Sequence, residues 1–168
     1  MQYLLQKCAV ECAEAAGYIR KETGERDSAH AWNILKIDGD YYYLYTTWDD
    51  SSNTVQTVKT NDLGFDYFCI TTDELIRTRD IDLCPTDVPS CDATRGNYYY
   101  HNDMVLDTYD LNKIKLLAQT AAKNKSKFFT FKCKTKALFE EAMSQLCSVG
   151  QDCYDALKAA AKIDKQIL

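Results

Sequence analysis

His30 is one of two histidines in this chain of 168 residues, and the residues after it could place chemistry around it. Seven positions separate it from the pair Asp38-Gly39, which is a strong two-residue signal for a β-hairpin turn. If that pair is the centre of the turn, Ile37 faces Asp40 and the remaining cross-strand pairs follow from this one. The sequence therefore predicts a hairpin with His30 on its first strand.

This register fixes which side chains meet near the histidine. Trp32 is expected to face Tyr45, and His30 to face Thr47, with all four side chains on one face of the hairpin. Tyr45 is then the diagonal neighbour of His30, at roughly 7–8 Å between backbones, within reach of a long side chain. We therefore expect the Tyr45 phenol to contact the His30 imidazole.

A histidine oriented by a second side chain is typical of nucleophilic catalysis, in which the imidazole takes a proton from the nucleophile. The orienting group is normally a carboxylate, because its charge stabilises the imidazolium that forms. Tyr45 is a phenol, which forms a hydrogen bond but supplies no charge at pH 7. The pair His30 and Tyr45 therefore has the arrangement of a catalytic pair without its electrostatics.

The string from His30 to Asp50, HAWNILKIDGDYYYLYTTWDD, resembles the His and Asp strands of the transglutaminase-like superfamily. The likeness is to bacterial proteins with a transglutaminase core of the papain-like α+β type. It continues in the strings YFCITTDELIRTRDI and VPSCDATRGNYYY, and so covers residues 1 to about 110. We therefore expect a papain/transglutaminase-like core.

The resemblance implies roles for individual residues. His30 matches the catalytic histidine of the family, and Trp32 and Asn33 match its companions. The end of the second strand is matched by Trp48, Asp49 and Asp50. The family's acid falls at the position of Tyr45, which is a departure from the pattern.

The family's nucleophilic cysteine is the second departure. It lies at the start of a helix that, in this chain, would begin before Met1, and YLLQK resembles the later turns of that helix. Cys8 and Cys12 match positions after the nucleophile. The resemblance therefore implies an N-terminally truncated core that lacks its thiol.

These departures lead to two functional hypotheses. The first is a transglutaminase-like domain that is catalytically inactive as given and serves as a peptide- or glycan-binding or scaffolding module. Its pocket would be formed by Trp32, Asn33, Thr47, Trp48, Asp49 and Asp50. The alternative is a C-terminal fragment of a longer cysteine-dependent protease or acyl-transfer enzyme, with His30 as general base and an upstream region of the same polypeptide as its partner. Neither hypothesis requires a cofactor.

Composition limits the other partners. The formal charge of −5 and the pI near 5.0 argue against nucleic acid or an anionic membrane as a partner. Eight lysines and no acid lie between Leu111 and Phe139, which favours a solvated helix face followed by a charged edge strand over polyanion binding. No apolar run is long enough to span a membrane, and no signal-peptide pattern is present. The family likeness alone implies an extracellular or cell-surface location.

Metal and disulfide sites have weak support. No Cys-x-x-Cys pair occurs and only two histidines are present, so no metal site is expected, and Asp49-Asp50 is more typical of a solvated turn than of a calcium site. Cys84 with Cys91, or Cys147 with Cys153, could close a small loop, but buried free thiols are the ordinary alternative.

The elements that position the site are predicted from periodicity and turn signals. Pattern alone predicts one helix over residues 2–19, whereas the resemblance places the helix end near Lys7 and a strand in VECAEAAGYI; we follow the resemblance. After the hairpin we expect a loop over 50–63, a short strand, and a helical turn capped by Thr71 or Thr72. A second hairpin is predicted about Asn102-Asp103.

The C-terminal third is predicted to be mostly helical. Helices are expected over 111–121 and 138–146, with the strand FFTFKC between them and an Ala-rich helix at the end. The segregation of strands and helices predicts an α+β fold with an antiparallel β-sheet. We expect a single domain over 1–168. Residues 1–50 are its catalytic-core remnant, 51–110 its loop and second hairpin, and 111–168 its helical C-terminal part.

Overall fold

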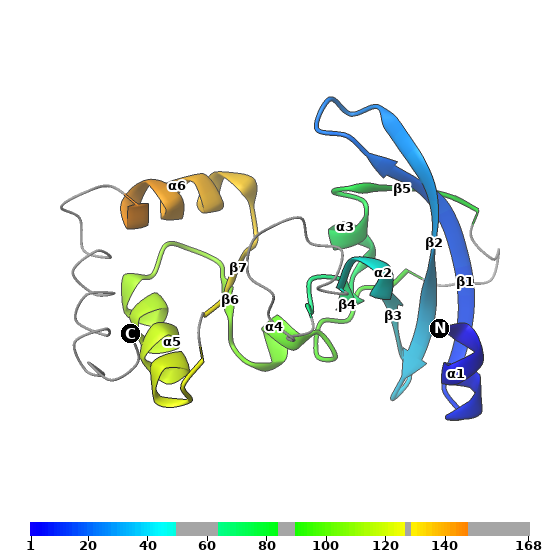
Figure 1. Cartoon of the computed structure of the whole chain (residues 1–168), viewed down its shortest axis with the longest axis horizontal. Helices are drawn as coiled ribbons and strands as arrows, with labels where there is room; N and C mark the ends of the chain where they lie inside the picture. The colour runs from blue at the N-terminus through cyan, green and yellow to red at the C-terminus, as the bar shows by residue number, and fades with distance from the viewer. Residues whose placement is uncertain (50–63, 84–89, 127–128, 148–168) are drawn as a thin grey trace. The chain divides into compact units, whose positions relative to one another are not determined.

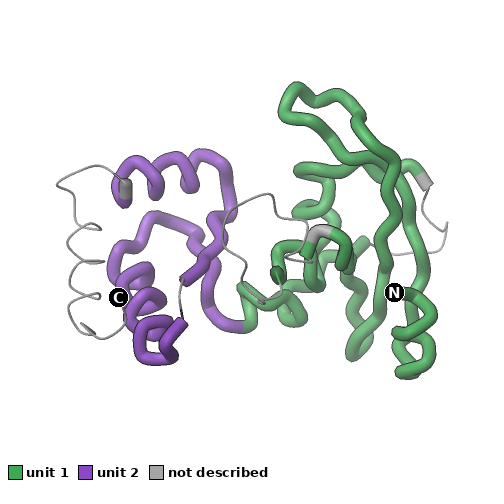
Figure 2. The backbone as a smooth tube through the Cα atoms, viewed as in Figure 1, with its two compact units in different colours: residues 1–101 green, residues 102–168 purple. Residues whose placement is uncertain are grey.

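The computed structural model describes residues 1–49, 64–83, 90–126 and 129–147 (Figure 1). The chain groups into two compact units, Met1–His101 and Asn102–Leu168 (Figure 2). The single domain over 1–168 stays a prediction. Several other predictions fall outside the described residues: the loop over 50–63, Asp50, Cys84, Cys153 and the last Ala-rich helix.

Unit 1 is built on a five-stranded antiparallel sheet with the order β4-β3-β2-β1-β5. The α+β class and the antiparallel sheet are therefore confirmed. The strands are β1 (Glu11–Arg20), β2 (Arg26–Ile37), β3 (Asp40–Leu44), β4 (Phe68–Ile70) and β5 (Arg79–Leu83). The helices of this unit are short: α1 (Gln2–Lys7), α2 (Thr46–Asp49), α3 (Thr72–Leu75) and α4 (Tyr98–His101).

The turn between β2 and β3 sets the predicted register. Asp38 and Gly39 both have positive φ, of 53° and 89°, which is the geometry of a type I′ turn. Ile37 pairs with Asp40, and the ladder continues to the pair Asn33 and Leu44. Arg95 holds the turn from a distant segment, donating from Nη2 to the Asp38 carbonyl at 2.8 Å. The predicted register is confirmed along this ladder.

The hairpin ends earlier than predicted. β3 stops at Leu44 and the chain enters helix α2, so the predicted pairing of His30 with Thr47 is wrong. A long-range contact explains the change of direction. The Asp49 carboxylate accepts the Tyr67 backbone N–H at 2.9 Å, and the Asp49 carbonyl accepts from Gly64 N–H at 2.8 Å.

β1 is a strand despite its alanine content. The single helix that pattern alone predicts is wrong, because α1 ends at Lys7 and Ala9 has a positive φ of 59°. The helix end and following strand that the resemblance implies are confirmed. Gly17 in β1 lies against β5, where an added Cβ would be 1.8 Å from the Asp80 carbonyl oxygen. Pairing with β2 and β5 therefore overrides the helix propensity of the alanines.

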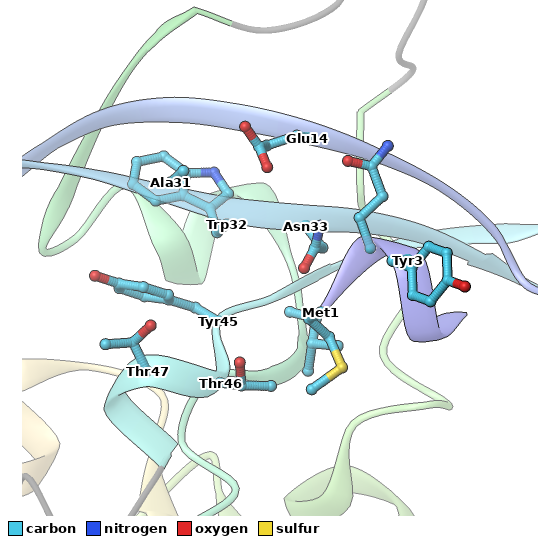
Figure 3. A pocket seen from close by; sticks show the side chains of 11 residues that line it. Met1, Tyr3, Glu14, Ala31, Trp32, Asn33, Tyr45, Thr46 and Thr47 are labelled. Carbon is cyan, nitrogen blue, oxygen red and sulfur yellow. The ribbon is translucent and has the colours of Figure 1, made fainter. Parts of the chain in front are cut away.

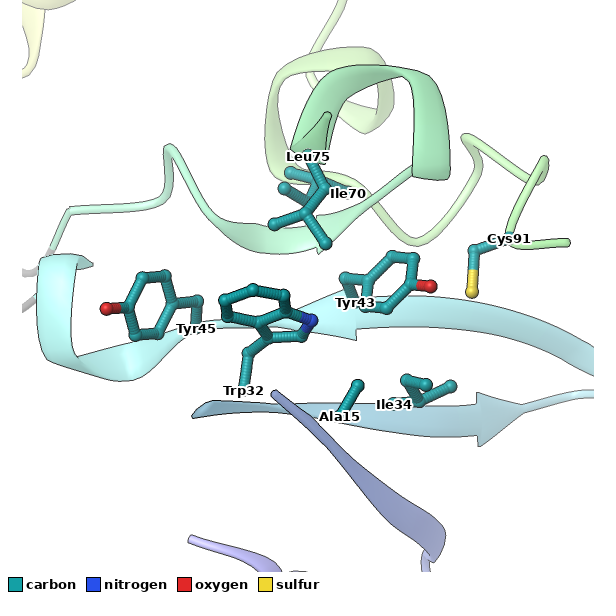
Figure 4. Close-up of a cluster of buried hydrophobic side chains, with 8 residues drawn as sticks. All are labelled: Ala15, Trp32, Ile34, Tyr43, Tyr45, Ile70, Leu75 and Cys91. Atoms are coloured by element: carbon teal, nitrogen blue, oxygen red, sulfur yellow. The ribbon is translucent and has the colours of Figure 1, made fainter. Parts of the chain in front are cut away.

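The two faces of the sheet bury different clusters. One face buries eight side chains, which Figure 4 shows between the hairpin strands and α3: Ala15, Trp32, Ile34, Tyr43, Tyr45, Ile70, Leu75 and Cys91. The opposite face buries Leu35, Tyr42, Leu44 and Cys69. Alternation along β2 therefore sends Trp32 and Leu35 to different cores.

Predictions between the hairpin and α4 have mixed outcomes. The short strand is confirmed as β4, and α3 begins with a capping box in which Thr71 and Glu74 bond each other's backbone. The second hairpin about Asn102-Asp103 is wrong, because residues before it form α4. Asn97 caps that helix: its Oδ1 accepts from Tyr99 N–H at 3.0 Å.

Unit 2 has a small core of its own. β6 (Val105–Leu106) and β7 (Lys132–Cys133) pair in parallel, and the chain between them contains α5 (Leu111–Lys123). A parallel pair needs such a crossover, so this part of the sheet prediction is corrected. Both predicted helices are confirmed, as α5 and α6 (Lys136–Cys147). Leu106, Ile114 and Leu138 form the core. Within the described ranges, no helix combines the length and apolar character needed to cross a bilayer.

Candidate functional site

His30 and Tyr45 meet where β3 turns away from β2. The Tyr45 hydroxyl is hydrogen-bonded to His30 Nδ1, and the imidazole tautomer decides which group donates. Their ring centroids are 5.7 Å apart, in an edge-to-face arrangement. Tyr45 is 1% exposed, whereas His30 is half-buried. The predicted contact across the hairpin is therefore formed.

A wall of aromatic rings supports this pair. The Tyr45 ring lies 5.8 Å from the rings of both Trp32 and Tyr67. The buried Arg79 guanidinium lies 5.3 Å from the Tyr45 centroid and 4.8 Å from that of Tyr67. A cation over two ring faces is a stabilising arrangement. Packing thus fixes the phenol in front of His30.

No carboxylate contacts His30 in the part of the chain that the structure describes. The only hydrogen bond of its side chain there goes to Tyr45. Asp49, which sequence analysis put in the pocket, is 8% exposed and holds the Tyr67 backbone N–H. The expectation of a solvated turn at Asp49 is therefore wrong, and the residue has a structural role.

A pocket of about 240 Å³ adjoins the pair, and Figure 3 shows side chains around it. It lies beyond the end of the β3 ladder. Its lining includes Glu14, Trp32, Asn33, Tyr45, Thr46 and Thr47. Of the predicted pocket residues, Trp32, Asn33 and Thr47 are thus brought together, while the side chain of Trp48 and all of Asp50 are outside what the structure describes.

The lining of the pocket is mostly polar. Trp32 and Tyr45 border it from the core, but they are only 2% and 1% exposed, and the Trp32 indole N–H is buried without an acceptor among the described residues. Glu14, Asn33 and the two threonines provide polar groups. Such a lining suits a ligand that forms a few hydrogen bonds.

Two thiols of unit 1, those of Cys12 and Cys69, lie away from the imidazole. His30 pairs with Gly17 on β1, and Cys12 is five positions further along that strand, about 17 Å away at strand geometry. Cys69 is fully buried in the core of the opposite sheet face, and burial raises the pKa of its thiol to about 11. Neither of these two thiols is placed to act as a nucleophile with His30.

Two lysines of the lysine-rich run in unit 2 form ion pairs with acids that precede the run. Lys113 bonds the Asp103 carboxylate at 2.6 Å, and Lys134 bonds Asp107 at 2.7 Å. Acids just before the run thus neutralise part of its charge. Among the described residues, no three His, Cys, Asp or Glu side chains gather as a metal site would require.

Comparison with known proteins gives no family. A scan against protein-family models finds no match to the chain, and a search of curated proteins finds none.

Sequence reasoning did not find Tyr67, Arg79 or Glu14. Tyr67 and Arg79 reach Tyr45 from segments 22 and 34 positions later, so no local pattern could connect them. Glu14 could have been predicted from the sequence. Once β1 is taken as a strand beside β2, Glu14 pairs with Asn33 and lies next to the predicted pocket residues.

Proposed function

We propose that unit 1 is a transglutaminase-like domain with a papain-like core, catalytically inactive as this chain, that binds a peptide or a glycan in the pocket beside Trp32 and Tyr45. One observation carries the proposal: His30 Nδ1 is held by a buried phenol, not by a carboxylate. The proposal includes the extracellular or cell-surface location that the family likeness implies.

The inactivity follows from what a base of this kind needs. An imidazole that takes a proton becomes cationic, and a carboxylate orients and stabilises it. Loss of that carboxylate lowers the rate about 10⁴-fold in a comparable triad. Tyr45 orients His30 without adding negative charge, and Cys12 and Cys69 lie outside its reach.

The binding role follows from the pocket. A volume of about 240 Å³ is below the usual range for a drug-sized ligand, so it fits one side chain or one sugar ring. Trp32 and Tyr45 border the pocket from the core, and Glu14, Thr46 and Thr47 offer polar groups. Both ligand classes carry groups that can hydrogen-bond to such a lining.

Alkylation of each cysteine by iodoacetamide at pH 6, followed by mass spectrometry, tests the inactivity. We expect every thiol of the whole chain to react no faster than free cysteine, in the native protein and in Tyr45→Asp. A thiol that reacts faster, and slows in His30→Ala, would contradict the proposal and support the alternative of a cysteine-dependent protease or acyl-transfer enzyme.

Titration of the ¹⁵N-labelled chain with short peptides and oligosaccharides tests the binding. We expect the Trp32 indole N–H resonance to shift with at least one of them, and Tyr45→Ala to weaken that binding. If neither peptides nor oligosaccharides shift the indole signal at millimolar concentration, a binding role for the pocket is contradicted.

A further inference from the structure

We propose that the free edge of β2, over Arg26 to Trp32, binds an extended peptide carrying a lysine or arginine, by adding that peptide to the sheet as a strand. This inference rests on the proposed function and names the ligand class and the binding mode. The basic side chain enters the pocket beside Trp32, and the peptide backbone pairs with Ala29 and Ala31.

The edge is free because β3 covers only part of β2. β3 pairs with Asn33 to Ile37 and then leaves the sheet at Leu44. β1 pairs with the other edge of β2 along its length, through Ala29 and beyond. The first part of β2 is therefore paired on one side only among the described residues.

The register shows which backbone groups face this free edge. Ile37 flanks a two-residue turn, so its N–H and C=O point to Asp40 on β3. Directions alternate along a strand, so Asn33, Ala31 and Ala29 point the same way. Asn33 meets Leu44, whereas Ala31 and Ala29 have no hydrogen-bonding partner on that side within the described chain.

These two residues are also accessible. Ala29 and Ala31 are exposed, and their methyl groups leave room for a strand to approach. Unpaired N–H and C=O groups repeating every second residue match the backbone of an extended chain. A peptide strand bound there would occupy the position next to β2 that β3 leaves after Leu44.

The pocket lies at the end of this edge, and its lining determines which side chain the peptide should carry. Ala31 belongs to both the edge and the pocket lining. Glu14 is the only carboxylate among the lining residues, and it is exposed, so a basic group can reach it. Unit 1 carries nine Lys and Arg against seventeen Asp and Glu, a formal charge of −8. A basic side chain is complementary to both the pocket and the unit.

A second copy of the chain fits this edge less well. Self-pairing would bring together two units that each carry a formal charge of −8, whereas a peptide with a lysine or arginine is complementary to that charge.

The test uses the ¹⁵N-labelled full chain and the probe peptide acetyl-Thr-Val-Lys-Val-Thr-amide. Control peptides carry N-methyl groups on alternate amides, or norleucine for lysine. The test variant is Ala31→Pro, which removes one edge N–H. Proline is tolerated on an unpaired edge, because that N–H bonds nothing within the sheet.

We expect the probe to slow amide exchange at Ala29 and Ala31 at least tenfold at saturation. Ala31→Pro should weaken binding about fivefold or more, from the loss of one hydrogen bond. The N-methylated peptide should not bind, and norleucine should weaken binding about fivefold or more. The peptide controls keep the test valid if Ala31→Pro does not fold.

Three results would overturn the inference, and they differ in whether the proposed function is also contradicted. A shifted Trp32 indole signal with unchanged Ala29 and Ala31 amides refutes strand addition but keeps the pocket as a binding site. Amides protected before any peptide is added, together with a dimer in sedimentation, assign the edge to a second copy. No response to the probe removes the basic peptide as ligand; if the wider peptide and oligosaccharide panel is silent too, the proposed function fails with it.

Discussion

Replacing Tyr45 by phenylalanine removes one oxygen atom, the hydroxyl bonded to His30 Nδ1, and keeps the buried ring. We expect the free energy of unfolding of unit 1 to fall by about 1 kcal/mol, because one net hydrogen bond contributes about 0.5–1.5 kcal/mol. Tyr45→Ala should lower it by about 3–5 kcal/mol, since the ring contacts with Trp32, Tyr67 and Arg79 are lost as well.

The measurement is urea unfolding followed by tryptophan fluorescence. Both tryptophans of the chain, Trp32 and Trp48, belong to unit 1, so the signal reports that unit alone. A double-mutant cycle with His30→Ala isolates the pair from other effects of each change. We expect a coupling energy of about 0.5–1.5 kcal/mol between positions 30 and 45.

Tyr67→Phe is the matched control for this cycle. Its ring also contacts Tyr45, but its hydroxyl lies 3.3 Å from Thr78 Oγ1 and does not contact His30. The effects of Tyr67→Phe and His30→Ala should therefore add within about 0.5 kcal/mol. A coupling energy between His30 and Tyr45 below about 0.3 kcal/mol, or no larger than in the control, would refute the contact on which the site is built.

Three further predictions test the surrounding structure. Gly17→Ala should abolish the folded fluorescence signal of unit 1, because its Cβ would meet the Asp80 carbonyl oxygen at 1.8 Å; a native unfolding curve would contradict this packing. At pH 8, Cys69 should alkylate about a hundredfold more slowly than free cysteine, because a pKa raised from 9.0 to about 11 leaves about a hundredth of the thiolate, and equal rates in peptide mapping would show that Cys69 is not buried. Thr71→Ala should lower the free energy of unfolding by about 1 kcal/mol through loss of the α3 cap, with Thr71→Ser close to native; no difference between them would argue against the capping box.

The hairpin register could be predicted because its determinant is local. A type I′ turn needs two residues that accept positive φ, and Asp38-Gly39 supplies both in adjacent positions. Once the turn is placed, every pair from Ile37 to Asn33 follows. Tyr45 could also be predicted as the neighbour of His30, because the last paired residues of β3 leave it at the right distance.

The end of β3 could not be predicted in the same way. Thr46 and Thr47 are typical of strands, and nothing near them in the sequence indicates a helix. The change of direction is held by Asp49, whose partner Tyr67 lies 18 positions later. The supporting ring of Tyr67 and the cation of Arg79 depend on the same long-range packing.

α4 was missed for a different reason. The tyrosines at 98–100 have high β-propensity, and the pair Asn102-Asp103 resembles a hairpin turn. Asn97 was the contrary signal, because asparagine before such a run is a favoured N-cap. In the structure its side-chain oxygen accepts the Tyr99 N–H, so the local cap prevails over strand propensity.

The Arg95 contact also bears on the order in which the chain folds. Its guanidinium bonds the Asp38 carbonyl from 57 positions further along, whereas the turn itself closes over two residues. Hairpins form in about 1–10 μs, and closing a much longer loop adds entropy that must be overcome first. We therefore expect the β2–β3 turn to form before the Arg95 contact, so that Arg95→Ala speeds unfolding and leaves the folding rate nearly unchanged in stopped-flow measurements.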